Sequence, residues 1–350
     1  MQLQARRVFR LSLVPSLSLA VAYALAIPLP FLAPLFAFML VSMPGPPIGA
    51  KGLAGLVVMI AITLSLGLLL IPMLLHYQLT ALLIVAFGIY LSSYLTVNMG
   101  KMLFGTFMTI GFTMISAAGS LNFAIATSVI QALVIGISVA VICHWIVYPF
   151  FPEDPAPAAS KPSPKPDGSA TGEQSNWIAL RSMIIVMPAY LLVLTNPGAY
   201  MPVIMKTVLL SQQSSMIDAK SAGRELLGST FLAGLFAMLF WAALGIWTNL
   251  WMFFLWMMLF SLYFSCKIFG LIRSRYPASF WLNVAVTMLI LLGPAVEDSA
   301  NGKDVYAAFF SRMALFVLVT FYAWGAVALL ERLRLRRMNK HNPDEESVTC

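Results

Sequence analysis

The chain has 350 residues, of which 60% are hydrophobic and 10% are charged, and its mean hydropathy is +0.88. A soluble domain normally carries about 25% charged residues, so this composition excludes a soluble globular protein and predicts an all-α polytopic membrane protein. The formal net charge is +8, but the basic residues are spread over short loops between apolar runs. This pattern is typical of contact with membrane lipid headgroups and predicts no nucleic-acid partner.

The first apolar run follows three arginines, Arg6, Arg7 and Arg10, and contains the tripeptide Ala22-Tyr23-Ala24. A basic start, an apolar stretch and small residues are also the marks of a cleaved signal peptide. The run contains Pro15, however, and a similar segment with a proline opens the second part of the chain. We interpret the run as an uncleaved first span, with a cleaved signal peptide as the alternative.

Six apolar segments precede a polar linker, and six more follow it. The first six cover residues 8–27, 30–43, 52–75, 78–96, 102–118 and 122–148. The linker is rich in Pro, Ser, Ala and Gly and offers no apolar periodicity around which to fold. The second six cover residues 177–195, 200–211, 223–246, 250–266, 280–293 and 305–330. Since only helices and closed barrels satisfy the backbone in lipid, and the runs do not alternate, these segments predict about twelve transmembrane helices.

The distribution of basic residues supports this layout. With a cytoplasmic N-terminus, eighteen of the 21 lysines and arginines fall on the cytoplasmic side, and only Lys303 falls in an outside loop. Lys206 and Arg312 fall within spans. Basic loops mark the cytoplasmic face of a membrane protein, so we expect a multi-pass protein of a bacterial inner membrane with both termini in the cytoplasm.

The two groups of six segments are predicted to be parallel repeats. Pro34 of the second segment matches Pro202 of the eighth, and Lys51 matches Lys220. An even number of spans gives both repeats the same orientation. The predicted organisation is a first membrane repeat over residues 1–150, a cytoplasmic linker over 151–176, a second repeat over 177–335 and a cytoplasmic tail over 336–350.

The second segment of each repeat is short and contains a proline. A pair of short, proline-interrupted segments at matching positions indicates the binding site of a transporter. In the second repeat this segment carries Lys206, whose charge costs about 2.5–3.5 kcal/mol near the bilayer midplane. We predict that Lys206 lines a cavity and binds an organic anion, with hydrogen bonds from Thr207, Ser211, Gln212 and Gln213. The alternative is that Lys206 reaches an interface or pairs with one of two acidic residues, Asp218 or Glu225.

Arg312, in the last span, has two equally open interpretations. It either contributes to substrate binding or reaches out to the acidic loop that contains Glu297, Asp298 and Asp304. No hydrolase, nucleotide-binding or zinc-protease motif is present in the sequence, and the three cysteines are too scattered for a disulfide framework or a metal cluster. The sequence therefore predicts neither an enzyme nor a bound cofactor or metal.

A resemblance to a known family adds to this interpretation. Over residues 212–234 a short span ends near a glutamine, a basic turn follows, and an arginine precedes a spaced Gly-Thr-Gly run. The residues in these places are Gln212, Arg224, Gly228, Thr230 and Gly234. The pattern resembles the fusaric acid resistance and aromatic acid exporter superfamily of bacterial inner membranes. Larger exporters of that group carry a cytoplasmic domain between the halves, whereas this chain has only the linker.

The resemblance implies efflux of aromatic or hydroxylated carboxylic acids and related toxic compounds, driven by the proton gradient. It also implies a periplasmic adaptor protein as partner. Glu225, beside the motif, either stabilises the start of its helix through the helix dipole or relays protons. Two alternatives remain from the residues themselves. The chain could be a major-facilitator-type carrier, which also has six plus six spans, or a non-transporting membrane subunit that anchors a partner complex.

Overall fold

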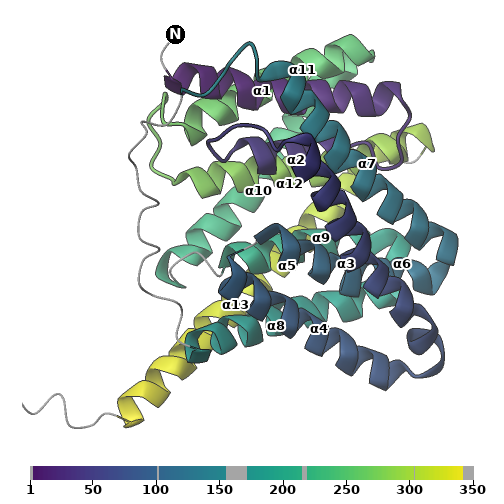
Figure 1. Cartoon of the computed structure of the whole chain (residues 1–350), viewed down its shortest axis with the longest axis vertical. Coiled ribbons are helices and arrows are strands. Elements are labelled where there is room, and N and C mark those ends of the chain that lie inside the picture. The colour runs from purple at the N-terminus through teal and green to yellow at the C-terminus, as the bar shows by residue number, and fades with distance from the viewer. Residues whose placement is uncertain (1–2, 101, 155–171, 215–218, 303, 342–350) are drawn as a thin grey trace, which may run out of the picture.

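A computed structural model describes residues 3–100, 102–154, 172–214, 219–302 and 304–341. These residues form a bundle of helices and contain no strands (Figure 1). The first half contains α1 (Leu3–Ala24), α2 (Leu32–Val41), α3 (Ala50–His76), α4 (Gln78–Met99), a fifth helix in three parts, α5 (Met102–Ile110), η1 (Gly111–Ile115) and α6 (Ser116–Leu121), and α7 (Phe123–Val147). The second half contains α8 (Gly172–Thr195), α9 (Pro197–Ser214), α10 (Ala219–Ile246), α11 (Leu250–Ile268), α12 (Ala278–Ala300) and α13 (Val305–His341).

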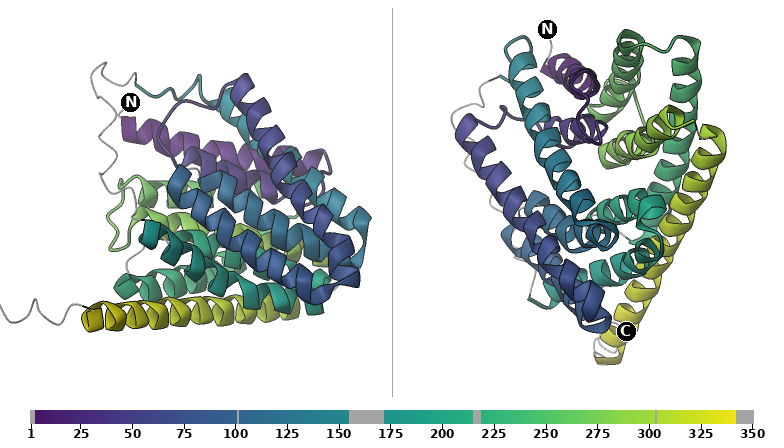
Figure 2. Two further views of the ribbon diagram at one scale, coloured as in Figure 1. Left: turned by 60° about the horizontal axis from the view of Figure 1, so that its bottom comes forward. Right: turned by 90° about the vertical axis from the view of Figure 1, so that its right-hand side faces the viewer.

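Each predicted apolar segment corresponds to one helix or to the three-part helix α5–η1–α6. Ten of these are long and apolar enough to cross a membrane among the residues described, so the prediction of an all-α polytopic membrane protein is confirmed. The short second helix of the first half, α2, has 10 residues. Its counterpart α9 has 18 residues, against 19 in α11, so the prediction of a short helix is wrong for the second half, although α9 is not among the ten. Figure 2 shows the start of α1 and the end of α13 at one end of the bundle, which we call the basic end.

Helix packing follows the predicted correspondence between the halves. The first helix of each half packs on the fourth helix of the other, α1 on α11 and α8 on α4. Within each half the first helix also packs on the second, and the second on the sixth. Because the same pairs recur after exchange of the halves, the bundle has an approximate two-fold relation. The second helices of the halves, α2 and α9, each contact the fifth helix of the opposite half and so lie between the halves.

The fifth helix of each half forms the centre of the bundle. The segment Leu103–Leu121 and the helix α12 are the most deeply buried of the candidate spans. Helices α3, α4, α10 and α13 instead expose large apolar side chains, among them Ile62, Leu69, Leu79, Leu83, Phe87, Phe231, Phe310 and Leu318. A bundle with an apolar outer surface is stable in the hydrocarbon of a membrane, because exposing these side chains to water would be unfavourable.

A π-helical turn interrupts the central helix of the first half. At η1 the backbone of α3 approaches so closely that a methyl group on Gly67 would overlap the carbonyl oxygen of Gly111. Only glycine tolerates such a backbone contact. Single π turns occur frequently at functional sites, and Met114 of η1 does line the cavity described below.

The structure changes the predicted limits of the linker and of the C-terminal tail. Helix α8 begins at Gly172, inside the predicted linker, and α13 runs to His341, beyond the predicted end of the repeat. Residues 332–340 are mostly Leu, Arg, Met and Lys, which favour helix, so the last helix continues into its basic end. Residues 153 and 154, assigned to the linker, are bound to α1.

Candidate functional site

A central cavity of about 1210 Å³ lies between the two halves. Its wall comes from the α1–α2 connection, η1, α6 and the start of α7 in the first half. The second half supplies the start of α9, the end of α12 and the first turns of α13. These ends lie opposite the basic end of the bundle. Exposed wall residues such as Leu121, at 52%, and Leu318, at 62%, show that the cavity reaches the surface.

The two halves contribute different chemistry to this wall. From the first half come Pro28, Leu29, Phe31, Met114, Leu121, Ile125, Ser128 and Val129, of which only Ser128 has a polar side chain. The second half supplies apolar residues too, but also the polar set Asn196, Tyr200, Glu297, Asp298, Asn301, Ser311 and Arg312. The cavity is therefore amphipathic, with an almost wholly apolar wall from the first half and the polar groups on the wall from the second half.

Arg312 is the one basic residue in the described wall, and it is paired. Its Nη2 lies 2.5 Å from Oδ2 of Asp298 on α12. The other terminal nitrogen, Nη1, is buried and has no hydrogen-bond partner among the described residues. Asp304 is engaged elsewhere, because its Oδ1 accepts hydrogen bonds from the backbone N–H groups of Tyr306 and Ala307 at the start of α13. Of the two open interpretations of Arg312, the structure thus shows both a place in a cavity and an acidic partner.

Asp298 and Glu297 lie in the last turn of α12, where the helix dipole disfavours negative charge. The guanidinium of Arg312 offsets this for Asp298, which is buried. Glu297 also lines the wall. Because Nη1 is buried and Nη2 is paired, an anion that enters the cavity reaches the guanidinium of Arg312 by displacing Asp298.

Lys206 lies outside the cavity wall, although its neighbour Met205 is part of it. The lysine is fully buried, and its Nζ donates to Oδ1 of Asn283 at 3.2 Å and to Oγ1 of Thr287 at 2.6 Å. Both partners are on α12, and Nδ2 of Asn283 donates in turn to Oγ of Ser229 on α10. Because successive residues of a helix point about 100° apart, Met205 faces the cavity while Lys206 faces the core of the second half.

Neither alternative for Lys206 is seen either. The ammonium group is away from any interface, and no carboxylate pairs with it among the side chains that the structure describes. Asp218 lies outside the described residues, and Glu225 is half-buried in the second turn of α10. The partners are neutral oxygen atoms, so the buried amino group is held by hydrogen bonds alone.

The other residues predicted to bind substrate do not gather around the cavity. Thr207 is buried and donates its hydroxyl to the carbonyl oxygen of Val203 in its own helix, at 2.7 Å. Ser211 is buried near the end of α9. The side chains of Gln212 and Gln213, and that of Arg224, lie outside the described part of the chain.

The motif residues on α10 serve helix packing where they are described. A methyl group on Gly228 would touch Phe280 of α12 at 3.4 Å, and one on Gly234 would overlap the side chain of Met313 on α13. Thr230 donates to the carbonyl oxygen of Leu226 and lies 3.3 Å from the hydroxyl of Thr320 on α13. These small residues let α10 approach the two helices that carry the polar side of the cavity.

Sequence reasoning did not identify the partners of Lys206. Asn283 and Thr287 are four residues apart in an otherwise apolar run, and this spacing places two polar groups on one helix face. That spacing is a usable signal, because a polar pair facing inward in a span needs a partner. The sequence cannot, however, say which of the other helices supplies it.

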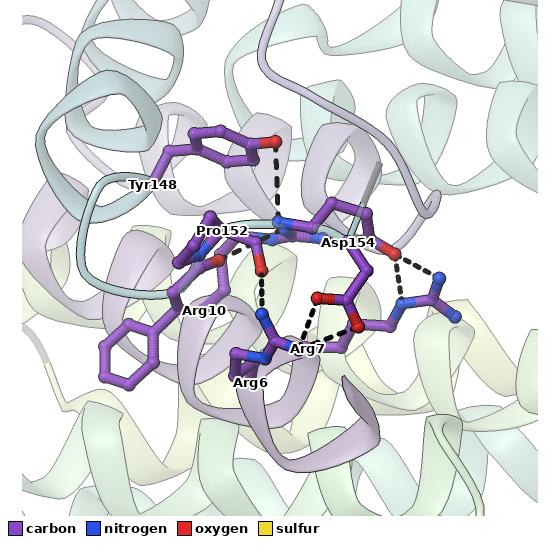
Figure 3. Close-up of polar contacts among 8 residues, drawn as sticks. Arg6, Arg7, Arg10, Tyr148, Pro152 and Asp154 are labelled. Carbon is purple, nitrogen blue, oxygen red and sulfur yellow. Dashed lines mark hydrogen bonds and ion pairs between the residues drawn. The ribbon is translucent and has the colours of Figure 1, made fainter. Parts of the chain in front are cut away.

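At the basic end, an arginine cluster of Arg6, Arg7 and Arg10 holds the chain after α7 (Figure 3). Arg6 bonds to both carboxylate oxygens of Asp154, at 2.6 and 2.8 Å. Arg7 and Arg10 both pair with Glu153, in the latter case at 2.7 Å. The second half has an equivalent pair, in which Nη1 of Arg181 on α8 lies 3.2 Å from Oε1 of Glu331 on α13.

Comparisons with known proteins add one match. Residues 7–147 match a family described as "Protein of unknown function (DUF2955)". No curated protein and no solved structure matches the chain. The matched region extends from the arginine cluster to the last residue of α7 and therefore coincides with the first six-helix half. It includes the apolar side of the cavity but not Lys206, Arg312 or the motif on α10.

Proposed function

We propose that this protein is an efflux transporter of small aromatic carboxylic acids, located in a bacterial inner membrane with the basic end in the cytoplasm. The observation that carries this proposal is the amphipathic cavity between the two halves. Its apolar side, from the first half, suits an aromatic ring. Its polar side offers Arg312, whose planar guanidinium is well matched to a carboxylate.

The size and position of the cavity also support transport. A volume of about 1210 Å³ is at the upper end of ligand pockets, which measure about 300–1000 Å³, and it accommodates a single- or double-ring acid with some water. Sites between the repeats of a carrier become accessible from alternate sides when the halves move. With the basic end cytoplasmic, a cavity that opens at the opposite end fits an outward-open state.

Two further parts of the proposal rest on the resemblance to aromatic acid exporters. The energy source is the proton gradient, and a periplasmic adaptor protein is the partner at the open end of the cavity. Lys206 is assigned to the transport cycle as a buried cation that meets the anion in another conformation. A charge without a carboxylate partner destabilises the core, and its retention there is accounted for by a role in function.

Export into inverted membrane vesicles tests the proposal. Labelled 4-hydroxybenzoate should accumulate in vesicles containing the protein when a proton gradient is imposed, whereas uncharged benzamide should not. Arg312→Gln should reduce accumulation about 10- to 100-fold, because a hydrogen bond to a charged group contributes about 1.5–3 kcal/mol. Arg273→Gln is the matched control, since Arg273 is exposed in the loop after α11.

Two results would contradict the proposal. Equal transport of the acid and the amide would remove the role of Arg312 in anion selection. An absence of gradient-dependent accumulation for aromatic acids, in vesicles that contain correctly inserted protein, would favour the non-transporting anchor subunit.

A further inference from the structure

The central cavity contains one charged group that the proposed function does not use. Three charged side chains line its described wall, namely Glu297, Asp298 and Arg312. Asp298 is buried and its carboxylate is paired with the guanidinium of Arg312, so the charges of these two side chains largely offset each other. The carboxylate of Glu297 is left as the unbalanced charge of the described wall.

Glu297 is accessible from the cavity. The residue is exposed, whereas Asp298 in the next position has only 6% of its surface exposed. Within the described part of the chain, no hydrogen bond or ion pair holds the carboxylate of Glu297. Glu297 also lies in the last turn of α12, where the partial negative charge of the helix end attracts cations. A positively charged group in the cavity can therefore contact Glu297 without displacing another side chain.

The apolar wall of the first half adjoins this carboxylate. Gly293 lies one helical turn before Glu297 on the same face of α12. A methyl group on Gly293 would overlap the ring of Phe31 from the first half, so this glycine lets the ring pack directly against α12. Phe31 and Glu297 both line the cavity. The cavity thus places a carboxylate one helical turn away from an aromatic ring of the other half.

We infer that the central cavity has a second binding site, at Glu297, for an aromatic organic cation, that is, an aromatic ring that carries an ammonium group. The carboxylate pairs with the ammonium group, and the face of an aromatic ring such as that of Phe31 also attracts a cation. Met114 and Met205 line the same cavity, and their flexible thioethers make favourable contacts with rings of different shape.

The site at Glu297 goes beyond the proposed export of aromatic acids. An acid that reaches Arg312 is repelled by the carboxylate of Glu297, because like charges repel each other. A cation is attracted by Glu297, and the pairing of Arg312 with Asp298 reduces its repulsion by the guanidinium. The two classes of molecule therefore depend on different side chains of one cavity. Substitutions at the two positions should act on them separately.

Equilibrium binding to the purified full-length protein in nanodiscs of phosphatidylcholine tests this inference. The probe is tritiated benzyltrimethylammonium, whose charge is permanent, and empty nanodiscs measure its partition into lipid. We expect saturable binding, against which uncharged neopentylbenzene, a molecule of the same shape, competes about tenfold less well. Glu297→Gln should weaken binding of the cation about tenfold, because the ion pair is lost. Glu297→Asp keeps the charge and should bind the cation more tightly than Glu297→Gln.

Asp304→Asn is the matched control, because Asp304 is an exposed carboxylate just before α13 and outside the cavity wall, and it should bind the cation like the wild-type protein. Binding of 4-hydroxybenzoate shows that Glu297→Gln is folded, and it should be unchanged or tighter in this variant. Arg312→Gln should do the reverse, losing the acid but keeping the cation.

Three results would each overturn the inference. They are non-saturable binding of the cation, equal binding by Glu297→Gln and the wild-type protein, and equal competition by neopentylbenzene. A failure to bind the acid alone would instead contradict the proposed function and leave the cation site in place.

Discussion

Phe38 and Lys206 occupy equivalent places in the two halves, four residues after the proline of the second helix. Both are fully buried. Phe38 packs in an apolar core, whereas Lys206 is held by Asn283 and Thr287. The same contrast extends to the whole halves, because residues 11–147 contain only two charged residues, Lys51 and Lys101, and neither is within a predicted span.

The second half places Glu297, Asp298 and Arg312 in the cavity wall and Lys206 beside it. The helix packing of the two halves is therefore similar, whereas their chemistry differs. The first half provides an apolar surface and the second half provides charge. A symmetric cavity would present the same groups on both sides, and an amphipathic molecule would then have no preferred orientation in it.

The largest expected effect on stability comes from placing a charged side chain at position 38 and an apolar one at position 206. Phe38→Lys buries a charge where no polar partner is provided, and we expect a loss of about 3 kcal/mol or more and failure to purify as a monodisperse protein. Lys206→Met removes a charge whose desolvation is not repaid by a carboxylate, so its apparent melting temperature in mild detergent should equal or exceed that of the wild type. Export by Lys206→Met should nevertheless be lost.

Equal apparent melting temperatures of Phe38→Lys and Lys206→Met would contradict the difference between the two halves. A large loss of stability in Lys206→Met would show that the lysine and its hydrogen bonds hold α9 to α12, and that the polar second half is structural. Phe38→Met serves as the control for side-chain size, because it keeps the first position apolar.

Much of this architecture is readable from the sequence. The twelve apolar runs predicted the helices correctly, because a membrane permits few structures other than helices. The position of Arg312 in a cavity and its contact with Asp298 were among the alternatives. The direction in which Lys206 points was not predictable, because a helix that lies between two halves has protein on every side. The carboxylate partners of Arg7 and Arg10 were hidden too, in a stretch whose composition resembles a linker.

The ion pairs at the basic end allow a second comparison of the two halves, with smaller expected losses of stability. Glu153→Gln should lower the free energy of unfolding by about 3 kcal/mol, because Arg10 has only 1% of its side chain exposed and loses its carboxylate. Glu331→Gln should cost about 1 kcal/mol, because Glu331 is 25% exposed and makes a single longer contact with Arg181. Apparent melting temperatures of the two variants in the same detergent measure the difference. Equal losses would mean that the two pairs contribute alike and that the halves are symmetric in this respect.

The smallest expected effect is a pH dependence that belongs to the first half. Burial alone would raise the pKa of Glu153, but hydrogen bonds and charge from Arg7 and Arg10 outweigh it and hold the pKa below its ordinary value of 4.5. A carboxyl group with a lowered pKa in the folded state stabilises the protein above the unfolded pKa and loses this contribution as the pH falls through the folded value. The difference in melting temperature between the wild type and Glu153→Gln should therefore be constant from pH 7 to about pH 5 and shrink below pH 4.5. In an Arg7→Gln background the shrinkage should begin at the same pH but be smaller and end at a higher pH, because one of the two groups that lower the folded-state pKa has been removed. A difference that stays constant down to pH 3 would show that the carboxylate does not titrate in this range and that the variant acts through packing alone.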